Sequence, residues 1–214
     1  MPFLAFEGLD GSGKSTLMDR LEMSLKKNQI KIVRTREPGG TKLGDEIRQL
    51  ILRTSGEAPT PRTELLLYQA SRAQHVDQVI KPALSRGDWV LSDRFSASSI
   101  AFQAGGRAIT EDDVEKLNHF STQGTRPELT VLLDLPVEKS IERRNQREQK
   151  TGERADRMES EKNDFHQRVR DSFLKQAKQN PQTWLVLDAE KSTDQLMEIL
   201  WEDLRRRGWV SLPL

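Results

Sequence analysis

Eight residues near the start of the chain have the types and spacing of a phosphate-binding loop. The segment Gly8-Leu9-Asp10-Gly11-Ser12-Gly13-Lys14-Ser15 fits the pattern G-x-x-x-x-G-K-[S/T] and lies between a predicted strand and a predicted helix. Glycines let successive backbone N–H groups turn toward a phosphate, and the following helix adds its positive end. We expect Lys14 to reach the β- and γ-phosphates and Ser15 to hold Mg²⁺. A plain glycine-rich turn would need neither the lysine nor the hydroxyl.

Charged residues also follow two other predicted strands. Arg36-Glu37-Pro38-Gly39-Gly40-Thr41 ends the second strand, and on its own this segment indicates a turn. The third strand ends in Ser92-Asp93-Arg94-Phe95, where Asp93 can orient water bound to Mg²⁺ and Arg94 can grip a phosphate. A structural salt bridge between Asp93 and Arg94 is the alternative interpretation.

Alternating strands and helices would position these loops. Segments rich in Val, Leu, Ile and Phe predict strands at 3–7, 31–36, 89–93, 129–135 and 184–188. Amphipathic segments predict helices at 16–27, 43–53, 63–86, 137–147, 161–178 and 193–207. This alternation implies right-handed crossovers and a parallel sheet with functional groups at the carboxyl ends of its strands. We therefore predict an α/β fold of the P-loop kinase type, a five-stranded parallel sheet with helices on both faces, in a single domain over residues 1–214.

Composition narrows the function. Charged residues make up 31% and hydrophobic residues 35% of the 214, which is typical of a globular protein, and no apolar run reaches membrane-spanning length. The start, MPFLAFEGLD, lacks the features of a secretory signal, so we expect a cytoplasmic protein. Without cysteine, thiolate catalysis and Cys-based zinc sites are excluded, and a net charge of +1 gives no reason to expect nucleic-acid binding. The three histidines, His75, His119 and His166, are scattered, and we expect them at the surface or in helices rather than as proton shuttles.

The chain strongly resembles the thymidylate kinase family, in particular its bacterial members. The matching segments occur in the family's order and extend over nearly the whole chain: 6–16, 35–41, 65–72, 93–95 with 98–103, and 156–159. This resemblance implies transfer of the γ-phosphoryl of ATP to dTMP, which yields dTDP and ADP in dTTP biosynthesis, with Mg²⁺ as cofactor. It also implies a homodimer, for which the helix predicted at 63–86 is a candidate interface.

The resemblance assigns roles at the acceptor nucleotide. Asp10 would contact the sugar 3′-hydroxyl, Tyr68 would stack on thymine where the family commonly has Phe, and Arg72, one helical turn later, would bind the carbonyl edge of the base. Phe102, at a position that is often Tyr, would crowd the sugar against a 2′-hydroxyl. The remaining acceptor residues are Ser98, Ser99 and Gln103 around thymine, Pro38, and the phosphate-binding Arg36, Arg48 and Arg94. Taken singly, Tyr68 and Phe102 would indicate ordinary helix packing, and Arg48 a solvated surface.

On the ATP side, the resemblance implies that residues 8–16, which include Thr16, bind the phosphates. It also implies that Arg143 packs on the adenine ring and that Asp188 and Ala189 form the other side of the adenine pocket. Bacterial members commonly carry Gly at the P-loop position of Gly11 and supply the missing cation from a mobile lid. The charged segment at about 144–158 is the expected lid, and Arg154 or Arg147 is the expected catalytic cation. A flexible, solvated loop is the alternative interpretation of this segment.

Two other functions are compatible with a P-loop. A deoxynucleoside kinase would need a base to deprotonate a sugar hydroxyl, and Glu37 is the candidate for that role. A GTP-dependent regulatory switch would need a guanine-specifying Asn-Lys-x-Asp segment, which the sequence lacks.

Overall fold

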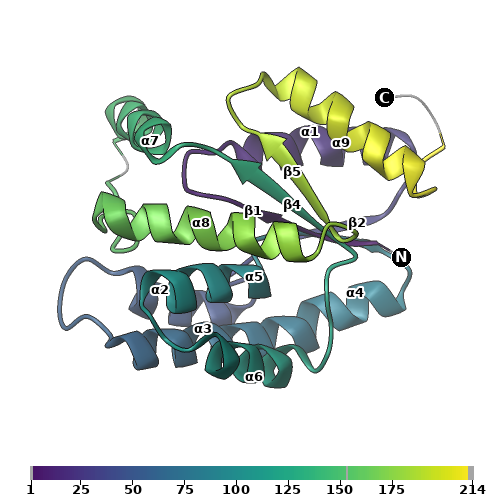
Figure 1. The fold of residues 1–214 in the computed structure, drawn as a ribbon. Coiled ribbons are helices and arrows are strands. Elements are labelled where there is room, and N and C mark those ends of the chain that lie inside the picture. The colour runs from purple at the N-terminus through teal and green to yellow at the C-terminus, as the bar shows by residue number, and fades with distance from the viewer. Residues whose placement is uncertain (1, 153, 212–214) are drawn as a thin grey trace.

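The computed structural model describes residues 2–152 and 154–211 and contains the predicted sheet, in which the paired strands run parallel (Figure 1). The strand order is β2-β3-β1-β4-β5. The bounds are β1 (Phe3–Glu7), β2 (Ile32–Arg36), β3 (Trp89–Asp93), β4 (Leu129–Asp134) and β5 (Trp184–Asp188). Three strands have the predicted bounds, β2 starts one residue later and β4 ends one residue earlier. The predicted α/β fold with a five-stranded parallel sheet is confirmed.

Burial differs between the middle and the edges of the sheet, and the sequence explains the difference. The central strand β1 reads Phe-Leu-Ala-Phe-Glu, and all of its residues are buried, because helices cover both faces. The edge strands β2 and β5 are instead mostly partly buried or exposed, with Leu187 of β5 as the one buried residue in them. Because β1 pairs with β3 on one side and with β4 on the other, the chain connections diverge at its carboxyl end. Such a divergence is where parallel α/β sheets bind ligands.

Two layers of helices enclose the sheet (Figure 1). The helices α1 (Lys14–Lys27) and α9 (Thr193–Arg206) lie together on one face, where their apolar residues form one core with β1, β3, β4 and β5. The opposite layer contains α2 (Lys42–Leu52), α3 (Pro61–His75), α4 (Lys81–Ser85), α5 (Ser96–Ser99), α6 (Glu111–Thr122) and α8 (Asn163–Gln179). The helix α7 (Val137–Thr151) lies beyond the carboxyl ends of the strands (Figure 1).

The helices differ from the prediction in three places. The single helix expected at 63–86 is divided into α3, the π-helical turn η1 (Val76–Ile80) and α4. The segment from α5 through the π-helix η2 (Ile100–Gly106) to α6 was not predicted, because its serines and glycines have weak helical propensity. The helix α7 extends four residues past the predicted end at Arg147, to Thr151, and ends where Gly152 adopts φ 72°. Within the described residues, no helix is long and apolar enough to cross a membrane.

Candidate active site

The loop between β1 and α1 has the conformation that a phosphate cradle requires. Gly8, Gly11 and Gly13 have φ of 135°, 80° and 93°, which only glycine adopts at little cost. A side chain at Gly8 would come within 2.4 Å of the Leu133 carbonyl oxygen. The Ser12 hydroxyl is buried without a hydrogen-bond partner among the described residues, so it is available to a ligand.

The Lys14 side chain folds over this loop. Its Nζ donates to the carbonyl oxygens of Gly8 and Leu9, both at 3.1 Å, and lies 3.9 Å from the Asp10 carboxylate. Burial lowers the pKa of Lys14, and the neighbouring charge of Arg94 lowers it further. A polyanion in the loop would offset both effects, so the lysine fits the predicted phosphate role.

Glu7, the last residue of β1, holds the segment that follows β3. Its side chain is fully buried, and its carboxylate accepts hydrogen bonds from the Phe95 N–H at 2.9 Å, the Ser98 N–H at 3.2 Å and the Ser98 hydroxyl at 2.6 Å. Burial raises the pKa of Glu7 to about 7, although the charge of Arg94 acts in the opposite direction. The sequence reasoning missed this residue. Its signal was a carboxylate directly before the P-loop, in an otherwise apolar strand.

Arg94 is the cation closest to Asp10. Its Nη2 donates to the Asp10 carboxylate at 2.8 Å, and its guanidinium lies 5.0 Å from the centre of the Phe102 ring. Arg94 adopts φ 70°, an unfavourable conformation for a residue with a side chain, which is common at functional sites. Burial raises the pKa of Asp10, but the charges of Arg94 and Lys14 lower it more, so the net pKa lies below its ordinary value. Asp10 is therefore an anion that can accept a hydroxyl proton in a hydrogen bond.

A cleft of about 520 Å³, its open mouth included, lies beside Asp10 and Arg94. Ten of the eleven residues predicted for the acceptor nucleotide line it: Asp10, Pro38, Arg48, Tyr68, Arg72, Arg94, Ser98, Ser99, Phe102 and Gln103. They come from the loops after β1, β2 and β3 and from α2, α3, α5 and η2. Burial is the main cause that raises the pKa of Tyr68, so its ring is neutral and available for stacking. The structure thus brings together residues that are up to 93 positions apart, from Asp10 to Gln103.

Arg48 and Arg94 line this cleft, and Arg36 lies close enough to Arg48 to act on its charge. Burial lowers the pKa of Arg48, and the charges of Arg36 and Arg94 also act on it. The Arg48 guanidinium donates to the Pro38 carbonyl oxygen at 3.1 Å. Because arginines stay protonated, their mutual repulsion favours an anion between them.

Arg36 is the acceptor residue that does not line the cleft. Its side chain is 56% exposed and pairs with Asp45 at 3.2 Å. It lines an adjoining hollow together with Ser15 and Asp93, the two residues predicted to hold Mg²⁺. A hydroxyl and a carboxylate beside a phosphate cradle suit Mg²⁺, which binds few protein oxygens and takes its other ligands from water and phosphates. The donor set therefore fits this ion.

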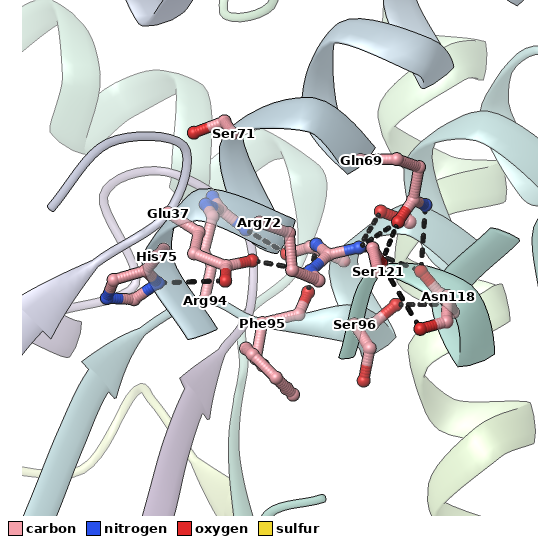
Figure 2. Close-up of polar contacts among 12 residues, drawn as sticks. Glu37, Gln69, Ser71, Arg72, His75, Arg94, Phe95, Ser96, Asn118 and Ser121 are labelled. Atoms are coloured by element: carbon pink, nitrogen blue, oxygen red, sulfur yellow. Dashed lines mark hydrogen bonds and ion pairs between the residues drawn. The ribbon is translucent and has the colours of Figure 1, made fainter. Parts of the chain in front are cut away.

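Arg72 forms the centre of a buried polar network (Figure 2). Its side chain is 1% exposed, and its Nε donates to Glu37 at 2.7 Å. One terminal nitrogen, Nη1, donates to Gln69, Ser99 and Asn118, and the other, Nη2, donates to the Phe95 carbonyl oxygen at 3.1 Å. Asn118, on α6, was absent from the sequence-based site because the helix that carries it was not predicted.

Arg143 connects the two sides of the predicted adenine site. Its guanidinium donates to the Gly11 carbonyl oxygen at 3.4 Å and to the Ala189 carbonyl oxygen at 3.0 Å, so α7, the P-loop and the loop after β5 meet there. The next residue, Arg144, packs beside Gly11, where a Cβ would lie 3.6 Å from its Cγ. Sequence reasoning passed over Arg144 in favour of arginines further along the same charged run.

The predicted lid is partly helical. Residues 144–151 continue α7, and Arg147 there pairs with both carboxylate oxygens of Glu159 at 2.8 Å. Arg154, after the end of the helix, is exposed. Arg157 donates to Glu64 at 2.7 Å and to the Ile51 carbonyl oxygen at 2.8 Å, so the end of the segment is attached to α3 and α2.

Glu64 is a further buried carboxylate that the sequence did not indicate as functional. It is 0% exposed and accepts hydrogen bonds from Gln103 at 3.0 Å, from Arg107 at 3.0 and 3.2 Å, and from Arg157. All three histidines lie in helices, as expected, and His75 and His166 are buried.

Comparison with known proteins agrees with this geometry. A family model described as Thymidylate kinase matches residues 6–199. The chain is 60% identical over 207 residues to the thymidylate kinase of Bdellovibrio bacteriovorus, with 97% of each chain covered. It is 47% identical to the thymidylate kinase of Prochlorococcus marinus, over 90% of this chain and 87% of the relative, and 44% identical to that of a Synechococcus species, over 95% and 96%. By its sequence and by the fold that carries this site, the chain belongs to the thymidylate kinase family.

Proposed function

We propose that this chain transfers the γ-phosphoryl of ATP to the phosphate of dTMP, which gives dTDP and ADP and supplies dTTP biosynthesis. As a member of the thymidylate kinase family it is a nucleoside monophosphate kinase, and no observation favours the two alternative functions. The observation that carries the proposal is one cleft, lined by Asp10 of the P-loop, that combines the Tyr68 ring with the guanidinium groups of Arg48, Arg72 and Arg94.

The acceptor nucleotide fills that cleft in our proposal. Tyr68 stacks on thymine, and Arg72, Ser99 and Gln103 surround the edges of the base. Asp10 accepts a hydrogen bond from the 3′-hydroxyl, and Phe102 occupies the space that a 2′-hydroxyl would need. The monophosphate lies near Pro38 and Ser98, beside the phosphate-binding arginines Arg36, Arg48 and Arg94.

The donor nucleotide binds on the P-loop side. Backbone N–H groups of residues 8–16 and the Lys14 ammonium hold the phosphates, and Arg143 packs on adenine. Bound Mg²⁺, held by Ser15 and through Asp93, would neutralise phosphate charge. The acceptor oxygen is already anionic, so no general base is needed, and the protein contributes alignment and positive charge.

The charged segment at 144–158 completes the site as a mobile lid in this proposal. We assign the catalytic cation to Arg154, because the other candidate, Arg147, is already paired with Glu159. Closure would exclude water from the transferring phosphoryl group.

A deoxynucleoside kinase would use Glu37 as a base, but this carboxylate already accepts hydrogen bonds from Arg72 and His75. A screen of nucleoside monophosphates and thymidine for ADP formation, with ATP and Mg²⁺, tests the proposal directly. We expect dTMP to give the highest kcat/KM, and a preference for thymidine or for another monophosphate would contradict it.

We also propose that the chain works in the cytoplasm, which holds the ATP and deoxynucleotide pools.

We further propose that it forms a homodimer through the outer faces of α3 and α6. Leu66 on α3 is 55% exposed and Phe120 on α6 is 79% exposed, and Phe120 lines a shallow hollow with Ala73. Exposed apolar side chains of this size suit a protein interface. Light scattering should give twice the chain mass for the wild type and the chain mass for Phe120→Lys; a monomeric wild type would contradict the dimer.

A further inference from the structure

The buried guanidinium of Arg72 has one hydrogen left for a ligand. An arginine side chain carries five N–H bonds, two of them on each terminal nitrogen. At Nη2 one N–H donates to the Phe95 carbonyl oxygen, and among the described residues the second has no partner. Because Arg72 lines the cleft, this second N–H is the one that can meet the base. Its direction depends on the plane in which the rest of the network holds the guanidinium.

Glu37 fixes that plane from the side opposite Asn118 (Figure 2). One of its carboxylate oxygens, Oε2, accepts from Arg72 Nε at 2.7 Å, and the other, Oε1, lies 3.0 Å from His75 Nδ1. Arg72 and His75 are three residues apart on α3, so they lie on the same face of the helix. A single carboxylate is therefore held by two consecutive turns of α3.

Both ring nitrogens of His75 have a hydrogen-bonding partner. An ionised carboxylate only accepts, so Nδ1 of the ring donates to Glu37. The other nitrogen, Nε2, lies 2.6 Å from the Thr35 hydroxyl, which can donate to a neutral ring or accept from a protonated one. Thr35 and Glu37 are two residues apart at the end of β2, so both side chains point toward α3. The result is a continuous chain from Thr35 through His75 and Glu37 to Arg72.

We propose that His75, oriented by Thr35, is a positioning residue for base recognition that acts through Glu37 on Arg72. This inference rests on the proposed function, in which Arg72 binds the carbonyl edge of the base. The described residues that line the cleft do not include His75, and the His75 side chain is 0% exposed. It therefore cannot touch the nucleotide, and its effect must pass through Glu37.

Packing alone does not account for this histidine. Burying a polar ring is unfavourable for each nitrogen left unbonded, whereas an apolar side chain would fill the same space without that cost. Both nitrogens are bonded here. The backbone also makes room for the ring, because a Cβ on Gly40 would lie 2.8 Å from Nε2 and 2.6 Å from the Thr35 hydroxyl.

The expected consequence is selectivity for the group at position 4 of the pyrimidine. Thymine has a carbonyl there, which accepts from an N–H, while cytosine has an amino group, which does not. An arginine held in one plane can discriminate the two, because the donor lies where the carbonyl must be. An arginine that can rotate loses part of that discrimination.

Three substitutions of His75 separate its two hydrogen bonds. His75→Asn places an amide nitrogen near the position of Nδ1 and keeps the bond to Glu37. His75→Gln reaches the position of Nε2 and keeps the contact with Thr35 but leaves Oε1 of Glu37 without its donor. His75→Phe removes both. We expect the KM for dTMP to rise about 10-fold in the Gln and Phe variants and less than about 3-fold in the Asn variant, which corresponds to the loss of about 1.4 kcal/mol in the first two.

The same variants should leave kcat and the KM for ATP within about 2-fold of wild type. The preference for dTMP over dCMP, measured as the ratio of the two kcat/KM values, should fall about 10-fold in the Gln and Phe variants.

Thr35→Val and Thr35→Ser form a matched pair that tests the other hydrogen bond of His75. The first removes the hydroxyl and should raise the KM for dTMP about 3-fold, and the second retains it and should behave like wild type. If His75→Phe does not fold, the contrast between Asn and Gln and the Thr35 pair still decide the question.

Equal changes in both KM values, or Asn and Gln variants that behave alike, would overturn the positioning role. Arg72→Ala, measured in parallel, separates this failure from failure of the proposed function. If Arg72→Ala loses the preference for dTMP while the His75 variants keep it, only the present inference is wrong. If Arg72→Ala keeps the preference, the proposed function of Arg72 is wrong as well.

Discussion

The base side and the lid side of the cleft are built in different ways. Around Arg72, a buried guanidinium, a carboxylate and several amide and hydroxyl groups are connected by hydrogen bonds of 2.6–3.1 Å. Across the cleft, the charged segment starts on an exposed part of α7 and ends at Arg157, and the arginine to which we assign catalysis is exposed. The base side is thus fixed by the folded core, whereas the lid side is attached mainly at its ends.

Substitutions on the two sides should therefore affect different steps of the reaction. A buried, satisfied network preserves geometry before the ligand arrives, so it suits discrimination between similar bases. An exposed arginine can move toward the bound phosphates, which attract it, so it suits stabilisation of the negative charge during phosphoryl transfer. Changes on the base side should alter dTMP binding and stability, and changes on the lid side should alter kcat alone.

The largest expected effect comes from the loop that both sides share. Lys14→Ala removes the charge at the phosphates, and we expect kcat to fall by about 10³-fold or more. The fold should persist, because among the described residues the Lys14 ammonium bonds only within the P-loop, to two carbonyl oxygens at 3.1 Å and to the Asp10 carboxylate at 3.9 Å. Steady-state kinetics and a thermal melt check both statements. An active variant would contradict the phosphate role of Lys14.

The next effect concerns the base side alone. Arg72→Ala should raise the KM for dTMP by about 10²-fold and leave the KM for ATP almost unchanged. It should also lower the free energy of unfolding by about 3 kcal/mol, because Glu37 would keep its buried charge with one partner fewer. Arg205→Ala, at an exposed position of α9, is the matched control. A rise in both KM values would show that the network is not specific to the base.

A smaller effect should distinguish the two lid arginines. We expect Arg154→Ala to lower kcat about 10- to 100-fold with an unchanged thermal melt, because its side chain is exposed. Arg147→Ala should lower kcat less than about 3-fold, since Glu159 pairs with that guanidinium. The reverse order would transfer the catalytic assignment to Arg147. A clear loss of stability in Arg154→Ala would contradict the view of the lid side as loosely attached.

The smallest and most specific test uses pH. Burial raises the pKa of Glu7 from 4.5 to about 7, so the folded protein binds a proton that the unfolded chain has released in this interval. The resulting stabilisation is complete below pH 4.5 and is lost as pH rises through 7, on the order of 3 kcal/mol in total. Glu7→Gln has no such group, so its stability should fall less than that of wild type over the same interval. Denaturant unfolding at several pH values measures this difference, and parallel curves would contradict the shifted pKa.

Much of the fold was predictable because local patterns determined it. The central strands β1 and β4 are mainly apolar and end in a carboxylate, and the P-loop follows β1 as its spacing indicates. The segment from Ser96 to Thr122 was missed because its short α5 and π-helical η2 depend on packing against α8 and α6 rather than on their own propensity. The extension of α7 to Thr151 was missed because a helix with few apolar residues has no hydrophobic period to detect.

The site divides in the same way. Residues within recognisable motifs, such as Asp10, Arg72 and Arg94, were predicted, and the structure brings them to one cleft. The buried carboxylates that hold them were not predicted as partners. Glu7 meets Ser98 across 91 positions, and Glu64 meets Arg157 across 93. Local sequence spacing cannot indicate contacts between residues so far apart in the chain, because these contacts form only when the fold is assembled.

Glu64 has a consequence for how the enzyme can change. One buried carboxylate holds Gln103 at the floor of the cleft and, on its other oxygen, Arg157 at the end of the charged segment. A substitution at Gln103 that admits a different base would also disturb the anchorage of the element that closes over the phosphates. Variants selected for new substrates should therefore carry compensating substitutions near Arg157, and a genetic screen for second-site suppressors would find them there.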